Sequence, residues 1–306
     1  MRPNALALLL VSAVTTACGS AGGEARRHEP RPAPELSPED RQRVNEALRM
    51  VARNDPGFPA VRDALAGRPD TAWWLTRAFV VDAVLALDQG AVDDVAFLRA
   101  VAGQGNASLV RSLNHLKAMG AAAVPCVVED LLEHPHTDRC ELGVRILTSI
   151  GKDALPALEP RLTHTEPRIR RHALEVVGGV GGPEVVPLLE RGTRDPDFGV
   201  RACAYQGLAR QGVAYLPRLH AALRSDPDPF VRRSVAKALA GFRDRGTAEA
   251  LVAYLAECQS AKDGEGAAAA DASLKRISGV RGTTHLESWR RWLATVPAGG
   301  VPARNE

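Results

Sequence analysis

One short stretch gathers most of the side chains in this sequence that could bind a metal ion. It reads His134-Pro135-His136-Thr137-Asp138-Arg139-Cys140, with Cys126 a little upstream. Imidazole nitrogens, a carboxylate and a thiolate are all ligands that zinc accepts. The spacing matches no common zinc motif, however, and a loop between helices collects His, Pro and Asp for its own reasons. We therefore predict no metal site, and name His134, His136, Asp138 and Cys140 as the residues that a metal would use.

Other chemistry is sparse. The chain contains no Gly-x-Ser-x-Gly, phosphate-binding loop or His-Glu-x-x-His pattern. We therefore expect no catalytic residue, no cofactor and no enzyme activity. The formal net charge is only +3 over 306 residues, and the sequence shows no concentrated basic face. This excludes a dedicated nucleic-acid binder, so we expect no nucleic-acid partner.

Four cysteines besides Cys18 raise the question of disulfides. They are Cys126, Cys140, Cys203 and Cys258. In an oxidising compartment an even number of cysteines can form bridges, and adjacent repeats would bring Cys126 close to Cys140. Each cysteine also falls on a helical face where it can serve as a small core residue. The sequence leaves both states open, for Cys126/Cys140 and for Cys203/Cys258.

The sequence segments that carry these residues follow a repeated pattern. Glu166-Pro167-Arg168-Ile169-Arg170 is followed by Asp197-Phe198-Gly199-Val200-Arg201 and Asp228-Pro229-Phe230-Val231-Arg232. Their last arginines are 31 residues apart (201 − 170 and 232 − 201). The acidic residue can cap a helix, and the proline suits its first turn. A constant period between about 20 and 50 residues is typical of a solenoid.

A second helix follows in each copy. Glycines at 120, 151, 182 and 212 can end the first helix, because glycine enters the left-handed conformation without strain. Val124-Pro125, Leu155-Pro156, Val186-Pro187 and Leu216-Pro217 then mark where the second helix starts. The whole pattern resembles the HEAT repeat, especially its short bacterial form with an Asp-Pro-x-x-Val-Arg opening. The resemblance covers about 106–258 and implies an all-α, right-handed solenoid of helical hairpins with terminal caps.

This resemblance implies a binding scaffold more than an enzyme. HEAT-like proteins include phycobilin lyases, an alkylpurine DNA glycosylase and a di-iron hydroxylase with repeated His-Glu pairs. Here the only such pair is His28-Glu29, near the N-terminus. The recurring arginines could form a basic ladder for phosphates. We favour instead their pairing with the acid four residues earlier or with a neighbouring copy.

The N-terminal segment is predicted to direct export. An apolar run, Ala5–Val14, follows Arg2 and is too short to span a bilayer. Thr15-Thr16-Ala17-Cys18-Gly19 resembles a bacterial lipobox, although Thr15 departs from the usual leucine. The resemblance implies a signal peptide over 1–17, lipid on Cys18 and passage to the outer membrane. Residues 18–36 are rich in Gly, Ala, Pro and charge, which predicts a disordered tether.

Residues 37–105 are predicted to be degenerate starting repeats, with helices at Pro38–Ala52, Phe58–Ala66, Thr71–Leu87 and Val92–Val101. Trp73 and Trp74 stand out there. Both are expected to be mainly structural, and one of them could be an exposed anchor for a partner. In the regular array, 106–258, the docking surface is expected on the concave face lined by the second helices. By register, Glu129, Glu159, Glu190 and His220 should lie on the exposed side of those helices.

The C-terminal part is predicted to close the array. Residues 259–297 should form a helical cap, interrupted by a loose Gly/Ala-rich segment at Ala261–Asp271. Trp289 and Trp292 fall on one helical face, where both indoles can cover the last repeat. This arrangement resembles the ends of other bacterial HEAT-repeat proteins. Residues 298–306 are predicted to be a disordered tail.

Together these features predict a lipid-anchored HEAT-repeat scaffold or adaptor at the bacterial envelope, facing the periplasm. Its expected partners are another protein and, through Cys18, a membrane. The alternative is a soluble periplasmic protein that binds a small ligand or metal in a groove. A lyase-type enzyme is a third interpretation, for which the sequence displays no cluster of acid and base residues.

Overall fold

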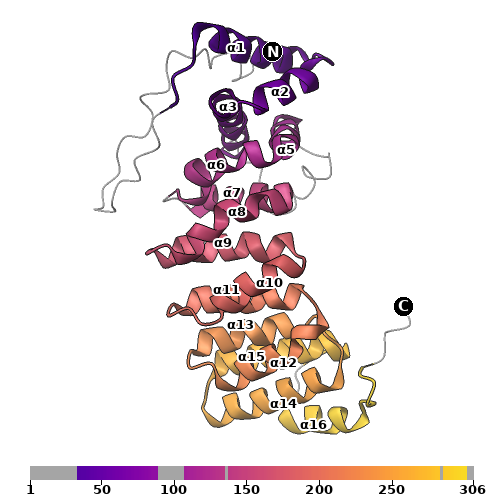
Figure 1. Ribbon diagram of the computed structural model, residues 1–306. Coiled ribbons are helices and arrows are strands. Elements are labelled where there is room, and N and C mark those ends of the chain that lie inside the picture. Colours follow the sequence, from indigo (N-terminus) through magenta and orange to yellow (C-terminus); the bar gives the residue numbers. More distant parts are fainter. Residues whose placement is uncertain (1–32, 89–106, 135–136, 283–284, 302–306) are drawn as a thin grey trace. The chain divides into compact units, whose positions relative to one another are not determined.

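The computed structural model describes residues 33–88, 107–134, 137–282 and 285–301. These residues form helices joined by short turns, with no strand among them (Figure 1). The predicted all-α solenoid is therefore confirmed. None of the described helices is long and apolar enough to cross a lipid bilayer. The predicted signal peptide, Cys18 and the helix expected at Val92–Val101 lie outside the described residues.

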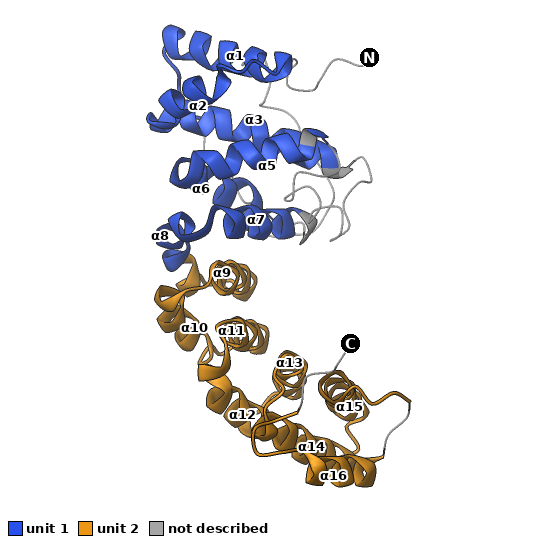
Figure 2. Cartoon of the chain, turned by 90° about the vertical axis from the view of Figure 1, so that its right-hand side faces the viewer, with its two compact units in different colours: residues 1–160 blue, residues 161–306 orange. Residues whose placement is uncertain are grey.

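The chain divides into two compact units, residues 1–160 and 161–306 (Figure 2). In unit 1, Ser37 caps the first helix by accepting a hydrogen bond from the backbone N–H of Asp40 at 3.0 Å. The ring of His115 lies between Phe58 and Phe79, with ring centroids 4.8 and 4.7 Å away. The helices of unit 1 are α1 (Pro38–Arg53), α2 (Phe58–Ala66), α3 (Pro69–Asp88), α5 (Ala107–Met119), α6 (Val124–Val127), α7 (Thr137–Ile150) and α8 (Leu155–Leu158).

The two adjacent tryptophans have different surroundings on α3. Trp73 is buried, with an exposed fraction of 6%, and the guanidinium of Arg77 lies 4.8 Å from its ring centre. Trp74 is half-buried, and its indole N–H donates to the carbonyl oxygen of Pro34 at 2.9 Å. Leu36 is also buried. The prediction of a disordered tether is therefore wrong for residues 33–36, because Trp74 on α3 gives Pro34 a polar partner and Leu36 is buried.

Unit 2 is a regular stack in two layers. Figure 2 shows α9, α11, α13 and α15 in one layer and α10, α12 and α14 in the other. The buried residues between the layers are apolar, for example Leu189, Leu208, Leu219 and Leu239. The helices are α9 (Pro167–Val180), α10 (Val186–Gly192), α11 (Phe198–Arg210), α12 (Leu216–Ser225), α13 (Pro229–Leu239), α14 (Arg245–Ser260), α15 (Gly264–Ser278) and α16 (Leu286–Thr295).

The turn between the two helices of each copy is where the sequence placed it. The helices α6, α8, α10 and α12 begin at the apolar residue before each predicted proline. A short 3₁₀ turn precedes each of them. The glycine that ends the first helix has a positive φ in every copy, between 53° and 105°: Gly120, Gly151, Gly182 and Gly212. A side chain at these positions would be strained, so the turn requires glycine.

The prediction of a loose segment at Ala261–Asp271 is wrong, because most of it belongs to helix α15. Asp263 caps this helix by accepting from the backbone N–H of Gly266 at 2.9 Å. Alanine has the highest helix propensity, and Ala269 and Ala270 are buried. A Cβ at Gly266 would lie 2.6 Å from the Sγ of Cys258. The small residues therefore allow close packing on α14, where composition alone suggested a loop.

Helix α16 closes unit 2. Trp289 is buried with 1% exposed, and its indole N–H donates to Asp271 at 2.8 Å. Trp292 packs edge-to-face on it, with ring centroids 5.5 Å apart. The prediction of a disordered tail is wrong for residues 298–301: the backbone N–H of Val301 donates to the carbonyl of Arg243 at 2.6 Å. This contact holds residues 298–301 against the turn before α14.

Candidate functional site

The repeated arginines form ion pairs from one copy to the next. Arg170 pairs with Asp195, Arg201 with Asp226 and Arg232 with Glu257, at 2.7, 3.0 and 2.6 Å. Each partner lies 25 residues further along the chain. Pairing with a neighbouring copy is thus confirmed, whereas the acid four residues earlier is not the partner. These three guanidinium groups hold the stack together and are not available as a phosphate ladder.

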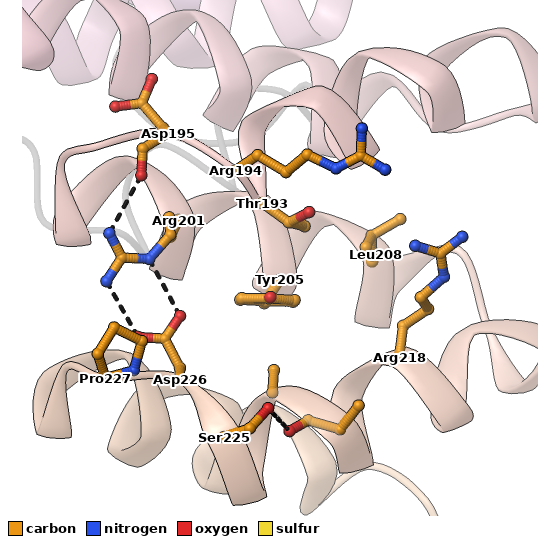
Figure 3. A pocket seen from close by; sticks show the side chains of 12 residues that line it. Thr193, Arg194, Asp195, Arg201, Tyr205, Leu208, Arg218, Ser225, Asp226 and Pro227 are labelled. Atoms are coloured by element: carbon orange, nitrogen blue, oxygen red, sulfur yellow. Dashed lines mark hydrogen bonds and ion pairs between the residues drawn. The ribbon is translucent and has the colours of Figure 1, made fainter.

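The middle pair shows how tightly the copies are joined (Figure 3). Arg201 donates through Nε and Nη2 to both carboxylate oxygens of Asp226, each at 3.0 Å. Its Nη1 donates to the carbonyl oxygens of Asp195 and Pro196 at 3.1 and 3.2 Å. The hydrogen bonds to Asp226 raise the pKa of Arg201. A guanidinium that makes a bidentate contact and two backbone contacts fixes the position of the inter-repeat turn.

Beside this pair lies a cavity of about 510 Å³. It is lined by the turn that follows α10, by α11 and by α12. A second cavity of about 450 Å³ shares Arg194 and Asp195 with it and continues along α10 to Leu162 and Thr163. We call the two together the unit 2 groove. Figure 3 shows Tyr205 in the middle of the first cavity, with the Arg201–Asp226 pair on one side and Arg194 and Arg218 on the other.

The charges of the unit 2 groove do not balance. Its carboxylates are all paired: Asp195 with Arg170, Asp226 with Arg201, and Glu190 with Arg218 at 3.0 Å. Arg191 and Arg194 also line the groove. Both are exposed, and neither side chain contacts an acid or a carbonyl of the described residues. The groove therefore has two cationic groups in excess.

Two hydroxyl groups of the groove are bound to the backbone. The hydroxyl of Thr193 donates to the carbonyl of Glu190, and that of Ser225 to the carbonyl of Ala221, both at 2.8 Å. Burial, together with the nearby Asp226, raises the pKa of Tyr205. Among the described residues, neither the Thr193 hydroxyl nor the Ser225 hydroxyl has a basic partner of the kind that activates a nucleophile.

Two of the residues named as possible metal ligands, His134 and Cys140, have side chains that the structure describes. Cys140 is fully buried, and its thiol donates to the carbonyl of His134 at 2.8 Å. The Nε2 of His134 lies 3.4 Å from Arg139. No group of three or more His, Cys, Asp or Glu side chains in the described part of the chain is placed to hold a metal. His136 and the side chain of Asp138 lie outside the described residues.

Cys126, Cys140, Cys203 and Cys258 are all free thiols. Each Sγ contacts another group: that of Cys126 lies 3.5 Å from Asp130, and that of Cys203 lies 3.5 Å from the carbonyl of Arg171. Burial raises the pKa of Cys203 to about 12, and burial followed by Asp130 raises the pKa of Cys126. The bridges that the sequence left open are absent, and these two thiols have little nucleophilic thiolate.

The four residues expected on the exposed side of the second helices differ in accessibility. Glu159 is exposed, whereas Glu129, Glu190 and His220 are only partly exposed. Glu190 is engaged by Arg218. His220 lies 3.0 Å from the hydroxyl of Thr247, and burial lowers its pKa. Of the four, Glu190 alone lines the unit 2 groove.

Sequence reasoning missed the residues that give this groove its character: Arg191, Arg194, Tyr205 and Arg218. A signal for one of them existed. Thr163, Arg194 and Ser225 occupy the same register (194 − 163 and 225 − 194 both equal 31). Only one of these three residues is charged, and all three line the groove. A comparison of copies by register would have shown Arg194 as a departure from the repeat.

Comparison with known proteins agrees with this architecture. A family model described as HEAT repeats matches residues 124–209 and again residues 192–272. The similarity to HEAT repeats therefore extends over residues 124–272. The complex of CpcE and CpcF of phycocyanin lyase from Nostoc sp. PCC7120 matches at 18% identity and a TM-score of 0.33, covering 85% of this chain and 100% of that chain. A TM-score this low supports no argument about fold or activity. None of the curated proteins matches this chain.

Proposed function

We propose that this HEAT-repeat protein is a scaffold that binds another protein, and that the unit 2 groove is its docking surface. The observation that supports this most is the groove itself, which spans successive repeats and is lined by fixed ion pairs and two unpaired arginines. A solenoid exposes such a continuous surface because each repeat contacts only its neighbours. The hydroxyls of Thr193 and Ser225 donate to backbone carbonyls and not to a basic side chain, so binding without catalysis is the better account of the groove's chemistry.

We also propose that the scaffold is anchored by lipid on Cys18 and faces the periplasm from the outer membrane. The support is the sequence alone: a short apolar run that ends directly before a cysteine. Such an anchor would place the array at the envelope without a membrane-spanning helix. The intact mass of the mature protein tests it. An acylated glyceryl adduct on Cys18 is expected, and a lipid-free chain in the aqueous phase would overturn the proposal.

Docking is tested by site-specific photo-crosslinking in cells. A photoreactive residue replaces Ala221, which is exposed and lines the groove, or Ala272, which is exposed on α15 outside it. We expect a discrete protein adduct from position 221 and none from 272. An adduct from position 272 alone would move the docking surface away from the groove. The absence of a protein adduct from both positions, with a metal or small molecule carried through purification, would favour the periplasmic ligand binder instead.

A further inference from the structure

We propose that the unit 2 groove recognises an acidic, extended segment of its protein partner, and that Arg191 and Arg194 select for it. This inference rests on the proposed protein-binding function and names the chemistry of the partner. Three observations support it: the unpaired cations, the depth of the paired carboxylates and the apolar floor.

The unpaired cations indicate that the ligand is negatively charged. Arg191 lies in the last turn of α10, Arg194 lies three residues further on in the turn that follows, and both line the groove. Nearby arginines are already paired, Arg218 with Glu190 and Arg201 with Asp226. A guanidinium presents a planar fork of donors that matches a carboxylate bidentately. Two such forks without an internal acceptor favour a ligand with at least two carboxylates.

Acids also line the groove, and they could repel an acidic ligand. The burial of these carboxylates removes this objection. The side chains of Asp195 and Asp226 are only 11% and 4% exposed, and each is neutralised by its arginine. Hydrogen bonds from the backbone N–H groups of Asp197 and Asp228, both at 2.9 Å, take up further lone pairs. An incoming carboxylate therefore meets exposed arginines first and two compensated pairs beneath them.

The floor indicates a polypeptide rather than a bare anion. Leu208 and Ala222 line the first cavity, and Leu162 and Pro187 line the second. Tyr205 adds a half-buried ring between α10 and α12. Crossing about two helix spacings, near 20 Å, takes roughly six residues of extended chain. Leu162, Leu208 and Ala222 are already buried, so the apolar surface open to a ligand is the exposed ring of Pro187 and the half-buried ring of Tyr205. An inorganic anion or a lipid headgroup would leave these two rings uncovered, whereas alternating acidic and apolar side chains would use both features.

The test is a titration of the full chain in nonionic micelles with fluorescent eight-residue peptides. One peptide alternates glutamate with leucine, and the other alternates lysine with leucine. We expect saturable binding of the acidic peptide that weakens as salt rises, and none of the basic one. The double variant Arg191→Ser/Arg194→Ser should bind about tenfold more weakly, from about 0.7 kcal/mol per exposed contact. Arg276→Ser on α15, exposed and outside the groove, is the matched control and should bind like wild type.

Charge reversal adds a gain of binding to the test, so that the result does not depend only on a loss of binding. Arg191→Glu/Arg194→Glu should abolish binding of the acidic peptide and create binding of the basic one. Circular dichroism and thermal unfolding should be unchanged, because neither arginine is part of an ion pair in the described structure. Equal binding of the acidic peptide by wild type and Arg191→Ser/Arg194→Ser would overturn the proposal. Binding of phosphatidylglycerol vesicles or inorganic phosphate in place of the peptide would overturn it too.

Crosslinking separates this inference from the function on which it rests. If Ala221 crosslinks a protein equally in wild type and in Arg191→Ser/Arg194→Ser, the groove binds protein without acidic recognition. The scaffold function would then stand and this inference would fall. If wild type crosslinks no protein at all, both fall. An adduct that depends on the two arginines and maps to an acidic segment of the partner supports both.

Discussion

The ion pair between Arg201 and Asp226 should contribute strongly to the stability of unit 2, and Arg201→Met tests this. The side chains of the pair are 13% and 4% exposed. Methionine keeps most of the length of the arginine stem but removes the charge. Asp226 would then stay buried without its ion-pair partner, and it would keep the hydrogen bond from the backbone N–H of Asp228. Two carbonyls that now accept from Arg201, those of Asp195 and Pro196, would also lose a donor.

The expected magnitude follows from this burial. Removing one partner of a buried pair costs about 3–5 kcal/mol, because the other charge is left uncompensated. The remaining hydrogen bond to Asp226 offsets part of that, so we expect a loss of about 3 kcal/mol. Arg232→Met is the control, in the same register of the next copy. Its partner Glu257 has a side chain that is 51% exposed. An exposed pair and a ring contact with Tyr254 together contribute about 1 kcal/mol.

The assay is urea unfolding of both variants followed by circular dichroism, with hydrogen exchange of the α11 and α13 amides. Hydrogen exchange is needed because a repeat array can unfold copy by copy, so that one global free energy is not defined. We expect Arg201→Met to lose about 2 kcal/mol more than Arg232→Met, with the largest loss of protection in α11 and α13. Equal losses in the two variants would refute the reasoning, since they differ chiefly in the burial of the carboxylate.

Four further outcomes are expected. Gly178→Ala should cost about 1–3 kcal/mol, because its Cβ would lie 2.8 Å from a backbone Cα of α11, whereas Gly264→Ala has no atom within 4 Å and serves as the control in the same unfolding assay. Burial alone would raise the pKa of Asp195, but hydrogen bonds from Arg170 and a backbone N–H outweigh it and lower the pKa. The stability due to Asp195 is then present above its unfolded pKa and lost as pH falls through the folded pKa, so acid titrations of Asp195→Asn should show a smaller acid-induced loss. Burial and neighbouring arginines lower the pKa of His115 to about 4 from 6.5, so thermal stability should fall as pH drops from 6.5 to 4, and His115→Leu should remove that part of the fall. Cys203 is partly exposed but should react slowly with a thiol reagent at neutral pH, because burial raises its pKa to about 12; rapid labelling of the native chain would contradict this.

Much of the fold could be predicted because its determinants are local. A proline in the first helical turn and a glycine with positive φ act within a few residues, so the starts of α10 and α12 were correctly placed. The helical character of 264–271 was missed for a different reason. A glycine and alanine composition is compatible with a loop, and only packing on Cys258 explains why these residues are small.

The ion pairs could be predicted only in part, because their partners are remote in sequence. Arg201 has Asp197 four residues before it, which suits a helical pair. In the structure Asp197 caps α11 through the backbone N–H of Val200, and Arg201 reaches across to Asp226. A capping carboxylate is already committed to the helix N-terminus. The acid that pairs with Arg201 is Asp226, which lies at the turn of the next copy. The periodicity of the sequence includes this acid, but it does not indicate which of the nearby acids forms the pair.

Two kinds of register position meet at the groove: positions that hold the same residue in successive copies, and positions whose residue differs between copies. Arg170, Arg201 and Arg232 recur at one register position and join the copies. At the register of Arg194, the flanking copies have Thr163 and Ser225, which also line the groove. Because such a position makes no inter-repeat ion pair, its residue can change without loss of the stack. Binding specificity in this array is therefore expected where the copies differ, and the architecture depends on where they agree.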